Sequence, residues 1–317
     1  MAIKNEKTMK AVRIHEYGTP DVLRYEDAQV PKIGPEDVLV KIAYTSVNPF
    51  DWKLRSGSAQ SYLPLKMPAI LGIDVAGKVE RIGAKVLGLK IGDKVFGRAD
   101  FTRGGSYAEY ASINYRSLAI APKSVSLREA AAFPVVAGTA WNALFDIANL
   151  KGGQRILITG ASGGVGSAAV QLAKSAGAHV IGTTSKKNME MLKSIGADEV
   201  IDYTDGDFTK KVKPVDVVFD TVGADTQTRS FGIIKKGGML ITTVGKPDQE
   251  LAKKHGITAK GFSASTDTKR LEEIARLVDA GKLKAVIGTE FNLPELKAAH
   301  ELSESRKADG KIMIKVA

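Results

Sequence analysis

The segment 155–167, RILITGASGGVGS, constrains the fold more than any other part of the chain, because a short apolar run leads directly into a cluster of glycines. The stretch that follows, VGSAAVQLAKSAG, has the periodicity of a helix. Glycines between a strand and a helix permit a tight turn, a close approach of the backbone to a phosphate, and close packing of helix on strand. We therefore predict a phosphate-binding turn that includes Ser162, Gly163, Gly164 and Val165; the alternative is a turn that only starts a helix.

Four more apolar, β-branched runs follow the glycine cluster, at 179–185, 199–203, 215–222 and 238–244, with helix-like stretches between them. Strands that are apolar throughout and alternate with helices are typical of a parallel sheet covered on both faces. The sequence therefore predicts a doubly wound, Rossmann-type α/β domain, to which we assign residues 125–284.

The N-terminal part of the chain has short strand-like runs at 38–44, 75–83 and 94–98, separated by turn sequences such as KIGPED and KIGDKV. Short strands at this spacing indicate a β-barrel or sandwich. We assign residues 1–124 to this domain, with residues 1–8 as a loose extension. The tail 285–317 has two strand-like ends around one helix and is expected to return to the same domain.

The end of the second Rossmann strand indicates which nucleotide binds. Sites that prefer NAD carry an Asp or Glu about 20 residues past the glycines. Between 179 and 189 this chain has no acid and instead carries Ser185, Lys186 and Lys187. Two lysines at a helix N-terminus oppose the helix dipole, and a 2′-phosphate would reverse that cost. We therefore predict NADPH as the cofactor; the alternative is that both lysines are only solvated.

The pattern TGASGGVG also fits the T-G-x-x-x-G-x-G turn of short-chain dehydrogenases. That family pairs the turn with a Y-x-x-x-K motif downstream. The one such motif in this chain, Tyr62 to Lys66, precedes the glycines. The order of the motifs therefore excludes the short-chain family.

Several motifs occur in an order that is known from another family. They are VNPFDWKLRSG (47–57), PAILGIDVAGKVERIG (68–83), GGSYAEYA (104–111), AAAFPVVAGTAWNAL (130–144), the glycine cluster, GADEVIDY (196–203) and GKIMIKV (310–316). The chain resembles the medium-chain dehydrogenase/reductases, and within them the zinc-independent quinone oxidoreductases and enone reductases related to zeta-crystallin. The resemblance implies a GroES-like β-barrel domain plus a Rossmann domain. It also implies NADPH-dependent hydride transfer to a quinone or to the β-carbon of an α,β-unsaturated carbonyl.

The resemblance also bears on zinc. Alcohol dehydrogenases of this superfamily bind catalytic zinc with a Cys, the His of a G-H-E motif, and a later Cys or Asp. This chain has no cysteine, and the corresponding motif reads Gly72-Ile73-Asp74. We expect neither a catalytic nor a structural metal. Without a metal to polarise a carbonyl, the hydride acceptor should be a carbon that is already electron-poor.

Three residues are candidates for catalysis by the same resemblance. Asn48 corresponds to a contact with the nicotinamide ribose. Lys53 lies where relatives carry Lys or Tyr, and would donate a hydrogen bond to the enolate; the alternative is a solvated barrel residue. Tyr62 would shape the substrate pocket, or else it is a packing aromatic.

Further cofactor contacts are carried over from the loops of relatives. Besides Asn48 and the glycine turn, the expected residues are Thr139, Ser185, Lys186, Lys187, Tyr203, Thr221, Val222, Gly223, Val244, Gly245, Ser263 and Lys311. Tyr203 would cover the adenosine end, and Lys311 would reach the phosphates. In relatives a phosphate-contacting Lys often follows the Ser by three or four residues, where this chain has Asn188 and Met189. Which lysine holds the 2′-phosphate therefore stays open.

The net charge of +11 permits a nucleic-acid partner, but the Lys and Arg residues are scattered, with no run longer than two. We expect a small-molecule substrate and neither nucleic acid nor a membrane as partner. The alternative functions are a crystallin-like NADPH-binding protein with an RNA-binding role and an enoyl-thioester reductase. The resemblance suggests a homodimer, and the polar N-terminus favours the cytoplasm.

Overall fold

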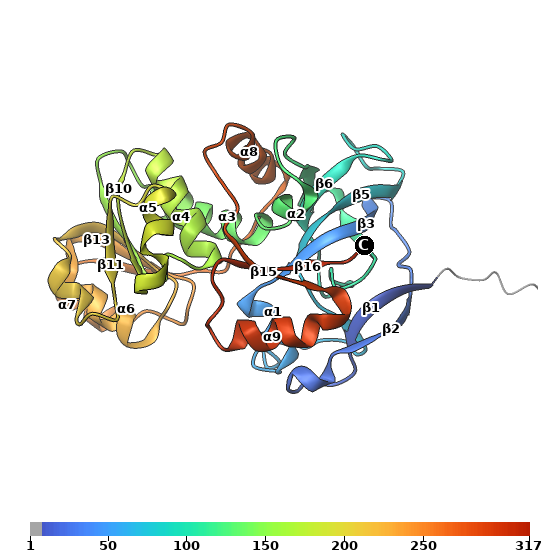
Figure 1. Cartoon of the computed structure of the whole chain (residues 1–317), viewed down its shortest axis with the longest axis horizontal. Helices are drawn as coiled ribbons and strands as arrows, with labels where there is room; N and C mark the ends of the chain where they lie inside the picture. Colours follow the sequence, from blue (N-terminus) through green and yellow to red (C-terminus); the bar gives the residue numbers. More distant parts are fainter. Residues whose placement is uncertain (1–7) are drawn as a thin grey trace, which may run out of the picture. The chain divides into compact units, whose positions relative to one another are not determined.

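The computed structural model describes residues 8–317, and the chain forms two compact units (Figure 1). The first unit contains the residues up to Val135 together with 266–279 and 285–317, and the second contains 136–265 and 280–284. Residues 1–7 of the expected loose extension lie outside the described residues. Thr8, the last residue of that expected extension, is instead the first residue of a strand.

A seven-stranded sheet builds the first unit, in the order β15-β16-β3-β5-β6-β8, with β7 also paired to β3. A smaller sheet has the order β2-β1-β4. The strands are β1 (Thr8–Ile14), β2 (Arg24–Gln29), β3 (Asp37–Val47), β4 (Ala69–Ile70), β5 (Asp74–Ile82), β6 (Lys94–Arg98), β7 (Tyr110–Asn114), β8 (Leu118–Ile120), β15 (Ile287–Asn292) and β16 (Lys311–Lys315). β15 and β16 run parallel, and the other pairs are antiparallel.

β3 is the strand on which the larger sheet is centred. Along one edge it pairs with β5, and along the other it pairs with β7 over 37–41 and with β16 over 44–47. Its alternate side chains Val38, Val40 and Ile42 are fully buried in one apolar cluster. The last strand of the chain therefore completes the sheet of the first unit beside β3.

The helices of the first unit are α1 (Pro49–Arg55), α2 (Leu127–Ala130), α8 (Thr268–Asp279) and α9 (Leu296–Glu304), with 3-10 turns η1 (Pro20–Val22), η2 (Tyr115–Ser117) and η7 (Leu293–Glu295). α9 packs against α1, as Figure 1 shows. α8 buries an apolar stripe and contacts β8. The sequence assigns α8 to the central domain, whereas it lies in the first unit because that stripe packs on this sheet.

The second unit is built on six parallel strands in the order β11-β10-β9-β12-β13-β14. They are β9 (Arg155–Ile158), β10 (His179–Thr184), β11 (Glu199–Asp202), β12 (Val215–Asp220), β13 (Ile234–Thr242) and β14 (Thr258–Gly261). The order grows outward from β9 in both directions, as in a Rossmann sheet. It confirms the predicted fold class, and β14, a short strand of mixed polarity, is the one addition to the predicted strands.

Helices and turns connect these strands: α3 (Pro134–Trp141), which begins in the first unit, the π-helical turn η3 (Asn142–Ile147), α4 (Gly164–Ser175), η4 (Lys186–Asn188), α5 (Met189–Ser194), η5 (Phe208–Lys211), α6 (Ala224–Ser230), η6 (Phe231–Ile233) and α7 (Gln249–His255). Leu157, Ile181, Val218 and Leu240, from four neighbouring strands, share one buried cluster. No helix among residues 8–317 is long and apolar enough to cross a membrane.

His300, on α9, is an exception in the apolar core of the first unit. It is fully buried, and its ring meets the Tyr107 ring edge-on with 5.7 Å between centroids. Neither ring nitrogen has a hydrogen-bond partner among residues 8–317. Burial, with the nearby charge of Arg55, lowers the pKa of His300 from 6.5 to about 3. The folded chain therefore holds this imidazole neutral.

This histidine is expected to make the fold sensitive to acid. Between pH 6.5 and 3 the unfolded chain binds a proton at His300 that the folded chain does not, so stability falls as pH falls below 6.5. His300→Phe should reduce the loss of unfolding free energy between pH 7 and pH 4 by about 3 kcal/mol. Urea unfolding at several pH values measures the difference, and an unchanged pH dependence would contradict the assignment.

Candidate functional site

Asp74, the first residue of β5, is a fully buried carboxylate at the centre of a polar cluster. Its Oδ2 accepts hydrogen bonds from Ser46 Oγ (2.5 Å), Asn48 Nδ2 (2.9 Å) and Lys311 Nζ (3.1 Å). Its Oδ1 accepts from the backbone N–H of Val135 (2.8 Å). Four donors, one of them charged, offset the cost of removing this carboxylate from water.

Lys311 begins β16 and is 4% exposed. Besides Asp74, its Nζ contacts Asn48 Oδ1 (2.8 Å) and the carbonyl oxygen of Val47 (3.5 Å). Its three N–H groups are therefore directed at three acceptors within the first unit. The sequence places Lys311 near the cofactor phosphates; that role stays a prediction, and the geometry does not favour it because the donors are engaged.

Asn48 is the N-cap of α1 and is buried. Its Oδ1 accepts from Lys311 and its Nδ2 donates to Asp74, so the two ends of the amide cannot be exchanged. These contacts leave one N–H of the amide unused. The structure thus fixes the orientation of a side chain that is predicted to contact the nicotinamide ribose.

Asp51, in the first turn of α1, also caps the N-terminal end of this helix. Its Oδ2 accepts from the backbone N–H of Asn48 (2.7 Å) and from Tyr107 OH (2.8 Å), whereas its buried Oδ1 has no partner among residues 8–317. Burial raises the pKa of Asp51 to about 7 and that of Tyr107 well above its usual value. Sequence reasoning missed both residues, although Asp51 stands in the quoted motif at the third helical position, where a carboxylate can cap.

The two other catalytic candidates lie on or just after α1. Lys53 is half-buried on the helix, and its Nζ lies 5.7 Å from the ring centroid of Trp52. Tyr62 follows the helix and is 72% exposed, so it is not a packing aromatic. The structure therefore brings Asn48 and Lys53 together on one short helix, and the pocket role of Tyr62 stays a prediction.

The motif Gly72-Ile73-Asp74, which the resemblance aligns with a zinc-ligating G-H-E motif, carries one apolar and one ion-paired side chain. Ile73 is buried and offers no ligand atom, and the carboxylate of Asp74 is occupied by Lys311, Asn48 and Ser46. Among residues 8–317, no group of three or more His, Cys, Asp or Glu side chains is arranged to hold a metal ion. A lysine ammonium thus stands as counter-ion beside the acid of this motif.

In the second unit, the glycine cluster forms the turn between β9 and α4. Gly160 has a φ of 63°, in the left-handed region that favours glycine. A Cβ on Gly166 would lie 2.3 Å from the carbonyl oxygen of Gly160, so no larger residue fits there. α4 begins at Gly164, and its N-cap Gly163 offers no side chain to the first turn. The free N–H groups of this turn and the close backbone packing fit the phosphates of a nucleotide.

Asp220, the last residue of β12, organises the loops around this turn. It is fully buried and accepts hydrogen bonds from Thr159 Oγ1 (2.8 Å), Gln227 Nε2 (2.9 Å) and Thr242 Oγ1 (3.0 Å). The backbone N–H groups of residues 222 and 223 also donate to it, both at 3.1 Å. One carboxylate therefore ties together the ends of β9, β12 and β13. Sequence reasoning predicted its neighbours Thr221, Val222, Gly223 and Val244 but missed Asp220 itself.

The residues predicted to bind the 2′-phosphate and the adenosine end of the cofactor lie at the carboxyl ends of β10 and β11. Ser185 follows β10, and Lys186 and Lys187 are exposed in the next turn. Tyr203 follows β11 and is 55% exposed; its backbone N–H donates to the carbonyl of Thr184 (3.1 Å), beside Ser185. The structure thus brings these four residues to one edge of the sheet.

An acid shares this edge. Hydrogen bonds from Thr204, with weaker effects of the charges on Lys211 and Lys186, hold the pKa of Asp202 below its usual range. The remaining cofactor candidates are dispersed: Thr139 is buried on α3, Gly245 follows β13 with a φ of 74°, and Ser263 is exposed after β14.

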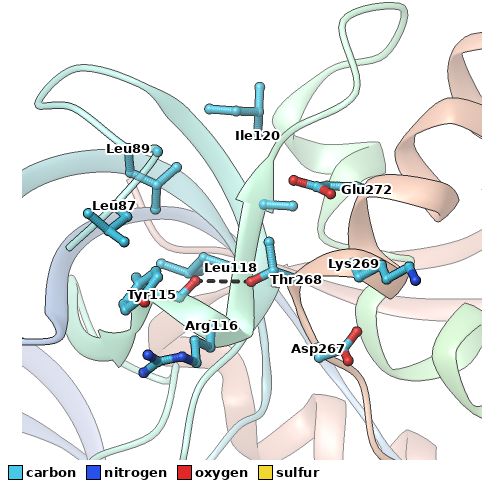
Figure 2. A pocket seen from close by; sticks show the side chains of 12 residues that line it. Leu87, Leu89, Tyr115, Arg116, Leu118, Ile120, Asp267, Thr268, Lys269 and Glu272 are labelled. Atoms are coloured by element: carbon cyan, nitrogen blue, oxygen red, sulfur yellow. Dashed lines mark hydrogen bonds between the residues drawn. The ribbon is translucent and has the colours of Figure 1, made fainter.

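A groove of about 320 Å³ opens on the first unit between β8, the loop 87–89 and the start of α8 (Figure 2). Leu87, Leu89 and Ile120 are among its apolar lining residues, and a hydrogen bond from Thr268 Oγ1 to the carbonyl of Tyr115 (3.2 Å) joins two other lining residues. None of the residues predicted from the sequence lines it.

The Asp74–Lys311 pair gives a first test of the site. Lys311→Met is expected to lower the free energy of unfolding by about 3–5 kcal/mol, because it leaves a buried carboxylate without its counter-ion. The double variant Lys311→Met, Asp74→Asn removes both charges and should recover most of this loss. Urea unfolding of the three proteins measures both effects. A single variant as stable as the wild type would show that the pair is not formed.

Comparison with known proteins gives two family models and close relatives. Residues 34–123 match the model described as alcohol dehydrogenase GroES-like domain, and residues 195–314 match the one described as zinc-binding dehydrogenase. A 2-methylene-furan-3-one reductase of Solanum lycopersicum is 35% identical, over 96% of this chain and 79% of the relative. The mitochondrial NAD(P)H oxidoreductase RTN4IP1 of Mus musculus is 33% identical, over 97% of this chain and 89% of the relative.

Solved structures give the same result. The quinone oxidoreductase from Coxiella burnetii superposes with a TM-score of 0.91 at 34% identity, over 98% of this chain and 100% of that one. The GroES-like part of the predicted fold class is confirmed by the match over 34–123. The protein belongs to the medium-chain dehydrogenase/reductase family, in its branch of nicotinamide-dependent quinone oxidoreductases and enone reductases.

Proposed function

We propose that the protein is an NADPH-dependent reductase that transfers hydride to a quinone or to the β-carbon of an α,β-unsaturated carbonyl, without zinc. The observation that carries the proposal is at the motif Gly72-Ile73-Asp74. Ile73 offers no metal ligand there, and the carboxylate of Asp74 is paired with Lys311. A site without a Lewis acid suits acceptors that delocalise the incoming charge themselves. The names of the relatives, a furanone reductase and a quinone oxidoreductase, support this substrate class.

The second unit would hold the cofactor, which supplies a hydride from its nicotinamide ring when bound. The glycine turn and the first turn of α4 would bind the pyrophosphate. Ser185, Lys186 and Lys187 would bind the 2′-phosphate, since the edge that carries them offers a hydroxyl and two ammonium groups. Asp202 at the same edge would repel the phosphate, because the pKa of this acid is held low and it stays charged. The phosphate should therefore lie nearer the lysines than Asp202.

The first unit would act on the acceptor. Negative charge develops on the acceptor oxygen during hydride addition, and a donor placed there lowers the barrier. Lys53 can donate to that oxygen, because the ring of Trp52 attracts its charge without using a hydrogen bond. The free N–H of the Asn48 amide is held in one direction by Asp74 and Lys311 and would position the ribose.

We further propose that the protein is a homodimer in the cytoplasm and that it binds neither nucleic acid nor membranes. The scattered lysines and arginines support the absence of a nucleic-acid partner. Size-exclusion chromatography with light scattering tests the dimer, and fractionation of cells that express the full chain tests the location.

The reaction is tested by a substrate panel. The purified chain should oxidise NADPH with a quinone or with an enone at least about tenfold faster, in kcat/KM, than with a saturated aldehyde, and a chelator should change neither rate, since no metal polarises the acceptor. Following NADPH absorbance with each acceptor measures this. No oxidation with any acceptor would favour a pure binding protein, and chelator-sensitive aldehyde reduction would favour a zinc dehydrogenase.

The cofactor preference is tested at Ser185. Ser185→Asp places a negative charge where the 2′-phosphate is expected, which should weaken NADPH about tenfold or more and NADH about twofold or less. Fluorescence titration with both nucleotides gives the two dissociation constants. Ser194→Asp, the same charge change at an exposed position of α5, is the matched control and should alter neither. An equal effect of Ser185→Asp on both nucleotides would exclude this phosphate site.

A further inference from the structure

Arg55 is the last residue of α1, and its side chain is 1% exposed. Its Nη2 donates to Oε1 of Glu304, the last residue of α9, which is 30% exposed. The two helices pack against each other in the first unit, where Figure 1 shows them side by side. The ion pair therefore joins the C-terminal ends of two neighbouring helices.

This ion pair is incompletely hydrogen-bonded. Nε and Nη1 of Arg55 are buried without a partner among residues 8–317, as are both ring nitrogens of His300 nearby. Burial lowers the pKa of Arg55, although the charge of Glu304 opposes this. Replacing a buried, incompletely hydrogen-bonded charge together with its partner by apolar side chains is often neutral or stabilising. Stability alone therefore does not account for the pair.

The opposite end of α1 is held from the same C-terminal segment. Lys311, in the strand that follows α9, donates to Oδ1 of Asn48, the N-cap of α1. α1 has seven residues, which is about two turns, and Lys53 lies between the two anchored ends. A movement of either end would therefore turn Lys53 and Asn48 together.

We propose that Arg55 and Glu304 are positioning residues: residues 304–311 hold α1 at both ends and thereby keep Asn48 and Lys53 in the orientation in which they act. The inference rests on the proposed reductase function, since that function gives Asn48 and Lys53 their roles. Arg55 and Glu304 act through α1 and not on the reacting atoms. A buried polar pair that fixes one geometry at the expense of stability has precedents in other folds.

Two variants and one control test the proposal. Glu304→Gln keeps the shape of the side chain and removes its charge. The double variant Arg55→Met, Glu304→Leu replaces the pair with apolar side chains. Lys297→Met breaks the exposed pair of Lys297 with Asp21 on the same helix α9, where the side chains are 52% and 71% exposed, and is the matched control. The readouts are urea unfolding, hydrogen exchange of the amides of 50–55, and NADPH oxidation with protiated and 4-deuterated cofactor.

We expect Glu304→Gln to unfold at a lower urea concentration than the wild type, because it leaves the buried Arg55 guanidinium without its counter-ion. The double variant should unfold at a urea concentration close to that of the wild type. In both variants the amides of 50–55 should exchange about tenfold faster. Turnover should fall about tenfold in the double variant and less in Glu304→Gln, with a larger isotope effect, because misplaced groups slow the hydride step. Lys297→Met should leave all three readouts unchanged. Wild-type exchange of 50–55 and wild-type turnover in the double variant would overturn the proposal.

Two further outcomes also decide it. If stability and turnover fall together in the double variant, or if Lys297→Met reproduces the loss of turnover, the pair is a structural contact and the proposal is wrong. If the wild type reduces no acceptor, the proposed function fails by itself. The exchange of 50–55 then still shows whether the pair holds α1, so the two failures are distinguishable.

Discussion

The ion pair between Asp74 and Lys311 is the contact on which the first unit depends. Its two members begin β5 and β16, the strands that lie on either side of β3. Both charges are almost fully buried, so each needs the other, and the amide of Asn48 bonds to both. A sheet register and a helix cap are thereby fixed by one pair of side chains.

The second unit also contains a fully buried carboxylate, that of Asp220. Asp220 has no ion-pair partner among its hydrogen bonds, and five N–H and O–H groups bond to it instead. Most of them lie at or just after the carboxyl ends of parallel strands, where α/β proteins bind their ligands. Both units therefore place a buried, hydrogen-bonded acid next to residues that are predicted to contact the cofactor, and its bonds fix the backbone and side chains around it.

The fold class and the glycine turn could be predicted from the sequence because both depend on local patterns. Strands buried in a parallel sheet are mostly apolar runs, Gly160 has a positive φ in a tight turn, and Gly166 is required by contacts with residues 160 and 161. The supporting contacts could not be predicted in this way. Lys311 and Asp74 are 237 residues apart, and Arg55 and Glu304 are 249 apart. Nothing local distinguishes Lys311 from a surface lysine, and the unit to which α8 belongs is likewise decided by the partner of its apolar stripe.

The pairing of β16 with β3 has a consequence for the order in which the chain matures during synthesis. Strands 37–47 and 74–82 leave the ribosome long before β16, and until then Asp74 has no counter-ion and one edge of β3 is only partly covered. The second unit draws most of its residues from the continuous stretch 136–265. It can therefore fold before the last strands of the first unit have been synthesised. In this protein the unit that is started first is the one that is finished last, and a chain cut short before Lys311 would carry a complete second unit and an incomplete first unit.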